Sequence, residues 1–347
     1  MRRNLYVTLS TARVRSALPV AVLLAAAVLI GLLPAGPVRA EPGTPGPEGG
    51  SASLRDQLEA ASRGFNDAAA RLDASKARHA QLTEQKRVAE AELSRLSDEV
   101  GAIAAAAYKG GPVGGVAALL DSDSPTGMFE RALTLDMQAR VSDGQLRRAR
   151  QAREAVARQQ AALDAEMKTQ QEQLTEMDKR RNAAEQALGI VGATTGGFGG
   201  TSGGRAVAVA RRADGTLARE SCNQNDPTTS GCITPRTLHS LQQARAAGFT
   251  RFTSCYRSAE DGGEHPRGRA CDFSVQQSGF GGVAGGGDRD YGNRLANWLV
   301  YNARALGVLY VIWFKKIWMP STGWRSYSGG GGDPSSDHTN HVHLSVQ

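Results

Sequence analysis

Residues 54–107 read LRDQLEAASRGFNDAAARLDASKARHAQLTEQKRVAEAELSRLSDEVGAIAAAA, and apolar side chains recur along them in alternating steps of four and three. Of the 16 positions in this series, 13 are apolar, and the exceptions are Ser75, His79 and Lys86. A repeat that persists over this many heptads is typical of a coiled-coil helix. We therefore expect one helix of 54 residues, which spans roughly 80 Å at 1.5 Å per residue.

A second and weaker series with the same steps runs from Met128 to Leu188. Between the two series, residues 109–127 combine a Gly/Pro-rich start, a short apolar piece and a polar turn. Two long helices joined by a short break most simply pair antiparallel. The sequence therefore predicts an all-α coiled-coil hairpin over residues 51–188, with its tip near 108–129.

The predicted hairpin has two interpretations. It is either a spacer or dimerisation rod, or an arm that binds another protein. The tip favours the arm, because it carries apolar residues where a simple turn needs only polar ones. These residues are Val113, Val116, Leu119, Leu120 and Phe129.

The N-terminal 40 residues have the organisation of a secretory signal. Arginines precede an apolar run of 17 residues, Ala17–Leu33, and small residues lead to Val38-Arg39-Ala40. A membrane anchor is the alternative, since this length is near the minimum for a span. We expect cleavage near Ala40 and an extracytoplasmic, secreted or wall-associated chain, beginning with a Pro/Gly-rich spacer over residues 41–50.

The net charge of +7 gives no support to a nucleic-acid partner. Five of the 41 basic residues are arginines of residues 1–40, which hold no acid, so 36 basic residues remain against 34 acidic ones. A nearly balanced chain lacks the electrostatic signature of nucleic-acid binding.

All four cysteines lie between residues 222 and 271. In an exported protein, an even number of cysteines predicts disulfides. Three pairings are possible, and we favour Cys222–Cys232, which closes a polar loop, with Cys255–Cys271, which ties two strands. A four-cysteine zinc site is the rival, but no pair has the close C-x-x-C spacing.

A Gly/Ser/Thr-rich linker, residues 189–204, precedes a region of different composition, residues 205–347, which we expect to be an α+β domain. Its pattern predicts helices over 234–247 and 290–306, strands over 251–256, 269–275, 309–317 and 341–346, a Gly-rich loop over 278–287 and another loop over 320–337.

Two short stretches of this domain carry four of the six histidines. The first contains His265 and Asp272, and the second contains His338, His341 and His343. Because side chains two apart in a strand share a face, we expect His341 and His343 to point the same way. Imidazole and carboxylate groups are zinc ligands, and three protein ligands leave one position for water. A polar cluster without metal is the alternative.

The pattern His265-x-x-Gly-x-Ala-x-Asp272, followed by His341-x-His343, resembles zinc peptidases that act on peptidoglycan. That family includes D-alanyl-D-alanine carboxypeptidases and dipeptidases and shares its core fold with the Hedgehog signalling domain. Residues 254–258, Ser-Cys-Tyr-Arg-Ser, match the family's Ser-x-Tyr-Arg-Ser segment. A narrower likeness is to an actinobacterial domain of unproven activity. The resemblance implies a small mixed or antiparallel sheet with flanking helices over roughly 220–347.

The resemblance also implies roles for individual residues. His265, Asp272 and His343 would hold Zn²⁺, and His341 would act as the base or stabilise the transition state. Arg257 would stabilise the developing oxyanion or hold a substrate carboxylate, because a fixed guanidinium supplies positive charge there.

Two features depart from this family. Some members carry a glutamate base where this chain has Asn340, although others use the first histidine of the pair, and Asp337 or His338 could orient His341. The other departure is geometric: if Cys255 and Cys271 pair, strict alternation turns Arg257 away from Asp272. The first strand must then end near Tyr256, or the disulfide prediction fails.

The arm resembles the coiled-coil region of secreted, division-associated cell-wall hydrolases. The shared segments are Ala-Ala-Tyr108-Lys-Gly-Gly, Leu119-Leu-Asp-Ser-Asp-Ser-Pro125 and Phe129-Glu-Arg-Ala-Leu. In those proteins the arm binds an extracellular loop of a transporter-like membrane complex, which relieves autoinhibition. We therefore expect a secreted zinc metallopeptidase that cleaves peptidoglycan stem peptides or crosslinks, positioned by a coiled-coil arm. The alternative is a non-catalytic wall-binding or hydrolase-activating protein that retains the peptidase fold.

Overall fold

The computed structural model describes residues 50–111, 114–189, 196–199, 203–259 and 262–347. The expected signal peptide, residues 1–40, lies outside the described residues, as do all of the expected spacer but Gly50 and part of the expected linker.

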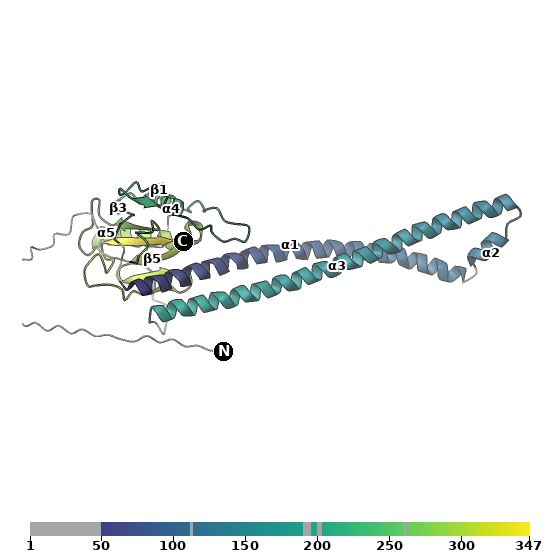
Figure 1. Cartoon of the computed structure of the whole chain (residues 1–347), viewed down its shortest axis with the longest axis horizontal. Helices are drawn as coiled ribbons and strands as arrows, with labels where there is room; N and C mark the ends of the chain where they lie inside the picture. Colours follow the sequence, from purple (N-terminus) through teal and green to yellow (C-terminus); the bar gives the residue numbers. More distant parts are fainter. Residues whose placement is uncertain (1–49, 112–113, 190–195, 200–202, 260–261) are drawn as a thin grey trace, which may run out of the picture. The chain divides into compact units, whose positions relative to one another are not determined.

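The predicted helical arm is confirmed. Helix α1 spans Ala52–Gly110, helix α3 spans Pro125–Ala187, and the two pack along each other (Figure 1). Ser51 and Ser124 cap them, and their hydroxyls accept main-chain N–H groups at 3.1 and 3.2 Å. Pro125 suits the first turn of α3 because an N–H there would have no partner in the helix. The helix therefore begins inside the predicted polar turn.

The seam of α1 is buried mainly at the end nearest the C-terminal domain. Eight of the nine buried residues of α1 lie between Arg55 and Ser75, and the ninth is Leu96. Two paired helices cannot enclose their own seam, so side chains become inaccessible chiefly where a further element covers them. In this chain that element is the C-terminal sheet.

The tip of the arm contains a short third helix, α2, Gly114–Leu120. Tyr108, Val116, Leu120 and Phe129 are each more than half exposed, as an apolar binding tip requires. Leu119 is half-buried, and Val113 lies outside the described residues.

The C-terminal domain is built on a six-stranded antiparallel sheet of order β3-β4-β8-β5-β6-β7. This arrangement confirms the predicted α+β class. The strands are β3 (Thr253–Ser254), β4 (Ala270–Ser274), β5 (Val308–Trp313), β6 (Lys316–Met319), β7 (Gly323–Ser326) and β8 (His341–Val346). A second, two-stranded sheet pairs β1 (Gln224–Asn225) with β2 (Cys232–Ile233).

The predicted helices of this domain are present with altered limits. Helix α4, Pro235–Ala246, begins after its cap Thr234, as the sequence indicates. The second predicted helix starts inside the Gly-rich loop and is interrupted, so that α5 spans Gly286–Tyr301 and α6 spans Ala303–Leu306. The interruption lies at Asn302, whose side-chain oxygen accepts the Ala206 N–H at 2.8 Å.

The single strand predicted over 309–317 is wrong. Residues Phe314 and Lys315 have φ values of 50° and 61°, so the chain reverses there and forms the β5–β6 hairpin. Positive φ at both residues of a two-residue loop matches the twist of the flanking strands. The loop predicted over 320–337 also contains a strand, β7, in which Trp324 pairs with Trp318.

Both favoured disulfides, Cys222–Cys232 and Cys255–Cys271, are formed. Strand β3 ends at Ser254, so Arg257 lies beyond the alternating part of the chain and is able to turn toward Asp272. Disulfides of this kind indicate an extracytoplasmic location.

No single helix within the described ranges is long and apolar enough to cross a membrane. Among the described helices, α1 and α2 taken together, across the bend between them, meet the criteria of length and composition.

The two faces of the six-stranded sheet have different partners. Val342, Leu344 and Phe273 face a core that includes Trp298 and Leu299 of α5. On the other face, strand residues such as Tyr310 and Ile312 pack against the near ends of the arm helices. The arm residues of this second core are Leu58 and Ala61 of α1 and Ala184 of α3.

Candidate metal centre

Neighbouring strands bring the candidate ligands together on the face that the arm covers. Asp272 of β4 lies directly opposite His343 of β8, and Ser274 lies opposite His341. Because side chains alternate along a strand, all four point to the same side, away from Phe273 and Leu344. His343 Nδ1 lies 2.8 Å from Asp272 Oδ1, and His341 Nε2 lies 3.4 Å from the same oxygen.

His265 reaches this carboxylate from the loop before β4. Its Nε2 lies 3.1 Å from Asp272 Oδ2. The loop turns at Gly268, where φ is +67° and a Cβ would lie 2.4 Å from Cys222 Sγ, so only glycine fits. One ligand atom from each of His265, Asp272 and His343 lies within 4.8 Å of the others, and all three residues are buried.

The outer ring nitrogens of the two histidines have polar partners. Nδ1 of His265 faces the main-chain oxygen of Cys255, and Nε2 of His343 lies 2.8 Å from Ser345 Oγ. A proton on each outer nitrogen would leave the inner nitrogen with a lone pair for a metal ion. Such contacts are the usual means of orienting metal-bound histidines. Two imidazoles and one carboxylate oriented in this way fit the donor set of Zn²⁺.

The side chain that orients His341 is Asn340. Asn340 donates its amide protons to Gly281 O at 2.7 Å and Ser335 Oγ at 3.1 Å, which turns Oδ1 toward His341 Nδ1 at 2.7 Å. Nδ1 must therefore donate, and Nε2 is the ring nitrogen that faces the site, 3.4 Å from Asp272 Oδ1.

Asp337 or His338 was expected to orient His341, and it is Asn340 that makes the polar contact. Asp337 pairs with Lys315 at 2.8 Å instead. His338 packs against the His341 ring, with centroids 4.8 Å apart.

Arg257 lies at the edge of the same cluster. Its Nη1 is 3.9 Å from Asp272 Oδ2, and its side chain is largely buried. The guanidinium therefore adds positive charge beside the ligand carboxylate. With it, all five residues singled out for chemistry in the sequence lie in one cluster.

Charge in the cluster is concentrated on Asp272. Burial alone would raise the pKa of this carboxyl, but the charges of His265 and His341 and their hydrogen bonds outweigh burial and hold the pKa well below its usual range. Burial, with the nearby charges of His341 and His343, lowers the pKa of His338 well below its usual range. The site thus combines an ionised carboxylate with a neutral His338.

Several residues of the cluster were not anticipated from the sequence. Tyr310 of β5 stacks on His343 with ring centroids 5.6 Å apart, and Phe280 packs against His341 at 5.4 Å. Ser345 follows from strand alternation two residues after His343. Tyr310 and Phe280 have no such local signal, because their contacts depend on strand order and loop path.

The N-terminal end of α1 closes over the loops that flank the cluster. The Ala52 side chain packs closely against Gly262, because a Cβ added to Gly262 would lie only 2.6 Å from the Ala52 Cβ. In addition, Gly50 N donates to Gly329 O at 2.7 Å. Glu59 of α1 binds Arg267 at 2.8 Å and Arg269 at 2.9 Å, on the His265 loop. The exposed fractions of His265, Asp272 and His343 are 1% or less, so the site is closed to a polymer in this arrangement.

Comparison with known proteins gives one match. No curated protein matches the chain. No solved structure matches it either. The family model described as VldE, C-terminal domain, matches residues 229–342, which is about a third of the chain and includes His265, Asp272 and His341. The match carries no link to the zinc peptidases that the sequence resembles. Residues 229–342 are thus similar to the C-terminal domain of VldE.

Proposed function

We propose that this protein is a zinc-dependent peptidase that cleaves peptidoglycan stem peptides or crosslinks. The observation that carries the proposal is the convergence of His265, Asp272 and His343, whose ligand atoms lie within 4.8 Å of one another. Two histidines and one carboxylate are the donor set of a catalytic rather than a structural zinc site. The peptidoglycan substrate rests on the resemblance of the motifs.

In this proposal Zn²⁺ supplies a Lewis acid that polarises the scissile carbonyl and lowers the pKa of water. His341 would then accept and return the proton, because Asn340 binds its Nδ1 and leaves Nε2 facing the site. Arg257, largely buried beside Asp272, provides a positive charge near the tetrahedral oxyanion.

The arm would regulate access and location. Because α1 covers the loops that carry and flank the ligands, a polymeric substrate requires its N-terminal turns to move. The exposed apolar tip, with Leu120 77% and Phe129 67% exposed, would bind a division-associated membrane complex. This partner rests on the resemblance of the arm, and the exposure of the tip supports it.

A non-catalytic wall-binding or hydrolase-activating role is the second candidate. Two observations favour it: residue 340 is an asparagine rather than an acid, and the whole cluster is buried. The orientation of His341 by Asn340 supports the enzyme instead, since this contact fixes which ring nitrogen faces the site.

The two candidates differ in turnover. We expect zinc-loaded protein to release soluble peptide fragments from isolated sacculi. A variant with Asp56→Lys and Glu59→Lys should release them faster, because α1 then loses its ion pairs with the His265 loop. His341→Ala should retain zinc and lose release. His239→Ala is the matched control, because that half-buried histidine contacts only the Val207 carbonyl among the described polar groups. Release from neither the intact chain nor the charge-reversed variant would refute the enzyme.

A further inference from the structure

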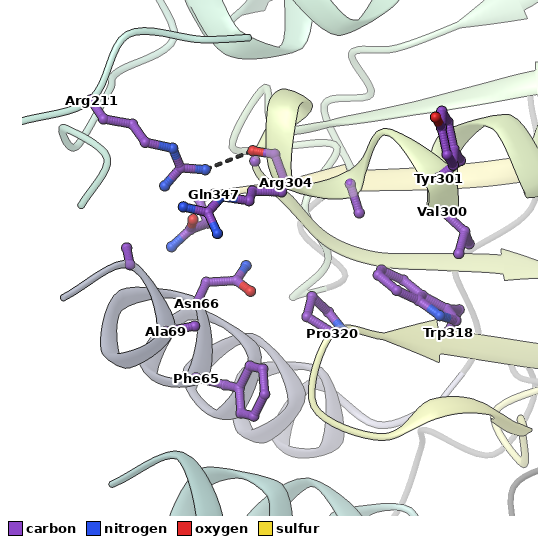
Figure 2. A pocket seen from close by; sticks show the side chains of 13 residues that line it. Phe65, Asn66, Ala69, Arg211, Val300, Tyr301, Arg304, Trp318, Pro320 and Gln347 are labelled. Atoms are coloured by element: carbon purple, nitrogen blue, oxygen red, sulfur yellow. Dashed lines mark hydrogen bonds between the residues drawn. The ribbon is translucent and has the colours of Figure 1, made fainter. Parts of the chain in front are cut away.

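A cavity of about 300 Å³ lies between α1 and the C-terminal domain, apart from the candidate metal centre (Figure 2). Helix α1 contributes Phe65, Asn66, Ala69 and Ala70 to its wall, and the C-terminal domain contributes the rest. Its wall includes Gln347, which follows β8 four residues after His343. At about 3.3 Å per strand residue, this places the cavity roughly 13 Å along the strand from His343.

One end of the cavity carries two arginines, Arg211 and Arg304 (Figure 2). These are the charged members among the described residues that line it, and no acid accompanies them. Arg211 is fixed by donating to Gly215 O at 3.0 Å and to Arg304 O at 2.6 Å. Burial, followed by the charge of Arg304, lowers the pKa of Arg211, and the charges of Asp67 and Asp73 oppose this only in part.

Two acids of α1 lie near this end. Asp73 forms an ion pair with Arg304, and Asp67 accepts from Gln347 Nε2 at 3.4 Å. The main-chain oxygen of Gln347 accepts from Arg236, outside the cavity. Arg211 donates only to main-chain oxygens among the described residues, so it is the cavity cation that no ion pair neutralises there.

The opposite end of the cavity is apolar. Trp318 and Pro320 form it from the sheet side, with Val300 of α5 and Phe65 of α1 beside them (Figure 2). The cavity thus has a cationic end and an aromatic end, with the amides of Asn66 and Gln347 in its wall. A molecule that fits both ends has one anionic head and a compact apolar body.

We propose that this cavity binds a small organic anion, a carboxylate or phosphate attached to an apolar body, with the head between Arg211 and Arg304 and the body against Trp318 and Phe65. Because α1 supplies one wall, the site is complete only while the arm is docked. A ligand that binds only the docked state stabilises that state by mass action. The anion therefore holds the arm in place and acts as an effector rather than a substrate.

The test uses phenyl phosphate as the probe on the purified chain, followed by titration calorimetry and by the fluorescence of Trp318. We expect one molecule to bind at least tenfold more tightly than inorganic phosphate, which lacks the body, or phenol, which lacks the head. Binding should also slow hydrogen exchange in residues 58–75 of α1. Benzoate in place of phenyl phosphate distinguishes a carboxylate ligand from a phosphate ligand.

Two variants address the two ends separately. Arg211→Gln should weaken binding at least tenfold by removing charge, and Ala69→Leu should do the same by filling the apolar space while both arginines remain. Arg212→Gln is the matched control, since this exposed neighbour does not line the cavity. Equal affinity for inorganic phosphate, an equal loss in the Arg212 variant, or no binding of either aromatic anion at millimolar concentration would overturn the proposal.

Discussion

At the scale of single residues, the contacts of Asn340 change the interpretation of that residue. In the sequence it stands where some of the zinc peptidases that the sequence resembles carry an acidic base, and so it counts against activity. In the structure its amide is held by Gly281 and Ser335, and its oxygen accepts from His341. The residue is therefore a positioning group, which sets the tautomer of the proposed proton carrier.

This role predicts a graded response to substitution. Asn340→Ala should lower the rate of peptide release about 10- to 100-fold, the usual cost of losing an orienting contact, while zinc content stays the same. Asn340→Asp retains an oxygen acceptor and should recover most of the rate. The rates of both variants, measured across pH on sacculi, check this, and an unchanged rate in Asn340→Ala would show that His341 needs no such contact.

Residue type and strand period together were enough to select His265, Asp272, His341 and His343, because the expected β8 matched the observed His341–Val346. The same reasoning could not find Tyr310 or the Glu59–Arg269 pair. Those contacts join residues far apart in the chain, and they depend on which strands and helices become neighbours. Local pattern contains no information on that choice.

At the scale of elements, long periodic segments were predicted best and short strands worst. Helix α1 extends only two or three residues beyond each end of its predicted range, since a heptad repeat averages over many positions. The β5–β6 hairpin was missed because Phe314 and Lys315 adopt positive φ without the Asn-Gly signal that marks such turns. The apolar run through them reads as one strand until the backbone is seen.

Also at the scale of elements, the exposed tip of the arm leads to a testable prediction about partner binding. Leu120→Asp with Phe129→Asp should abolish binding to the extracellular loop of the division-associated complex, because both side chains are exposed and apolar. Zinc content should not change. Val88→Asp, at a 56% exposed position of α1 away from the tip, is the matched control. Pull-down with the isolated loop measures the effect, and full binding by the double variant would exclude the tip as the contact.

At the scale of the whole molecule, the closed site depends on ion pairs between α1 and the His265 loop. Burial alone would raise the pKa of Glu59, but a hydrogen bond from Arg63 and the charges of Arg269, Arg63 and Arg267 outweigh it and lower the pKa below its ordinary value of 4.5. A group whose pKa is lowered on folding stabilises the folded state above its unfolded value. That contribution is lost as pH falls through the lowered value.

We therefore expect docking of α1 to weaken below about pH 4.5 more in the wild type than in Glu59→Gln, which lacks the titrating group. At neutral pH the variant should already show faster hydrogen exchange in residues 52–60. Hydrogen-exchange rates of residues 52–60, measured between pH 3 and 7 in both proteins, test whether Glu59 holds the arm. Identical pH profiles for the two proteins would mean that Glu59 does not hold the arm.

The proposed peptidase activity depends most directly on bound zinc. Zinc content of the purified chain, measured by mass spectrometry after equilibration with a slight excess of Zn²⁺ and gel filtration, should be about one ion per chain. His343→Gln and Asp272→Asn should each lose that ion, while His239→Ala retains it. A wild-type chain that elutes without zinc, or an equal content in all four proteins, would contradict the assignment of His265, Asp272 and His343 as a metal centre.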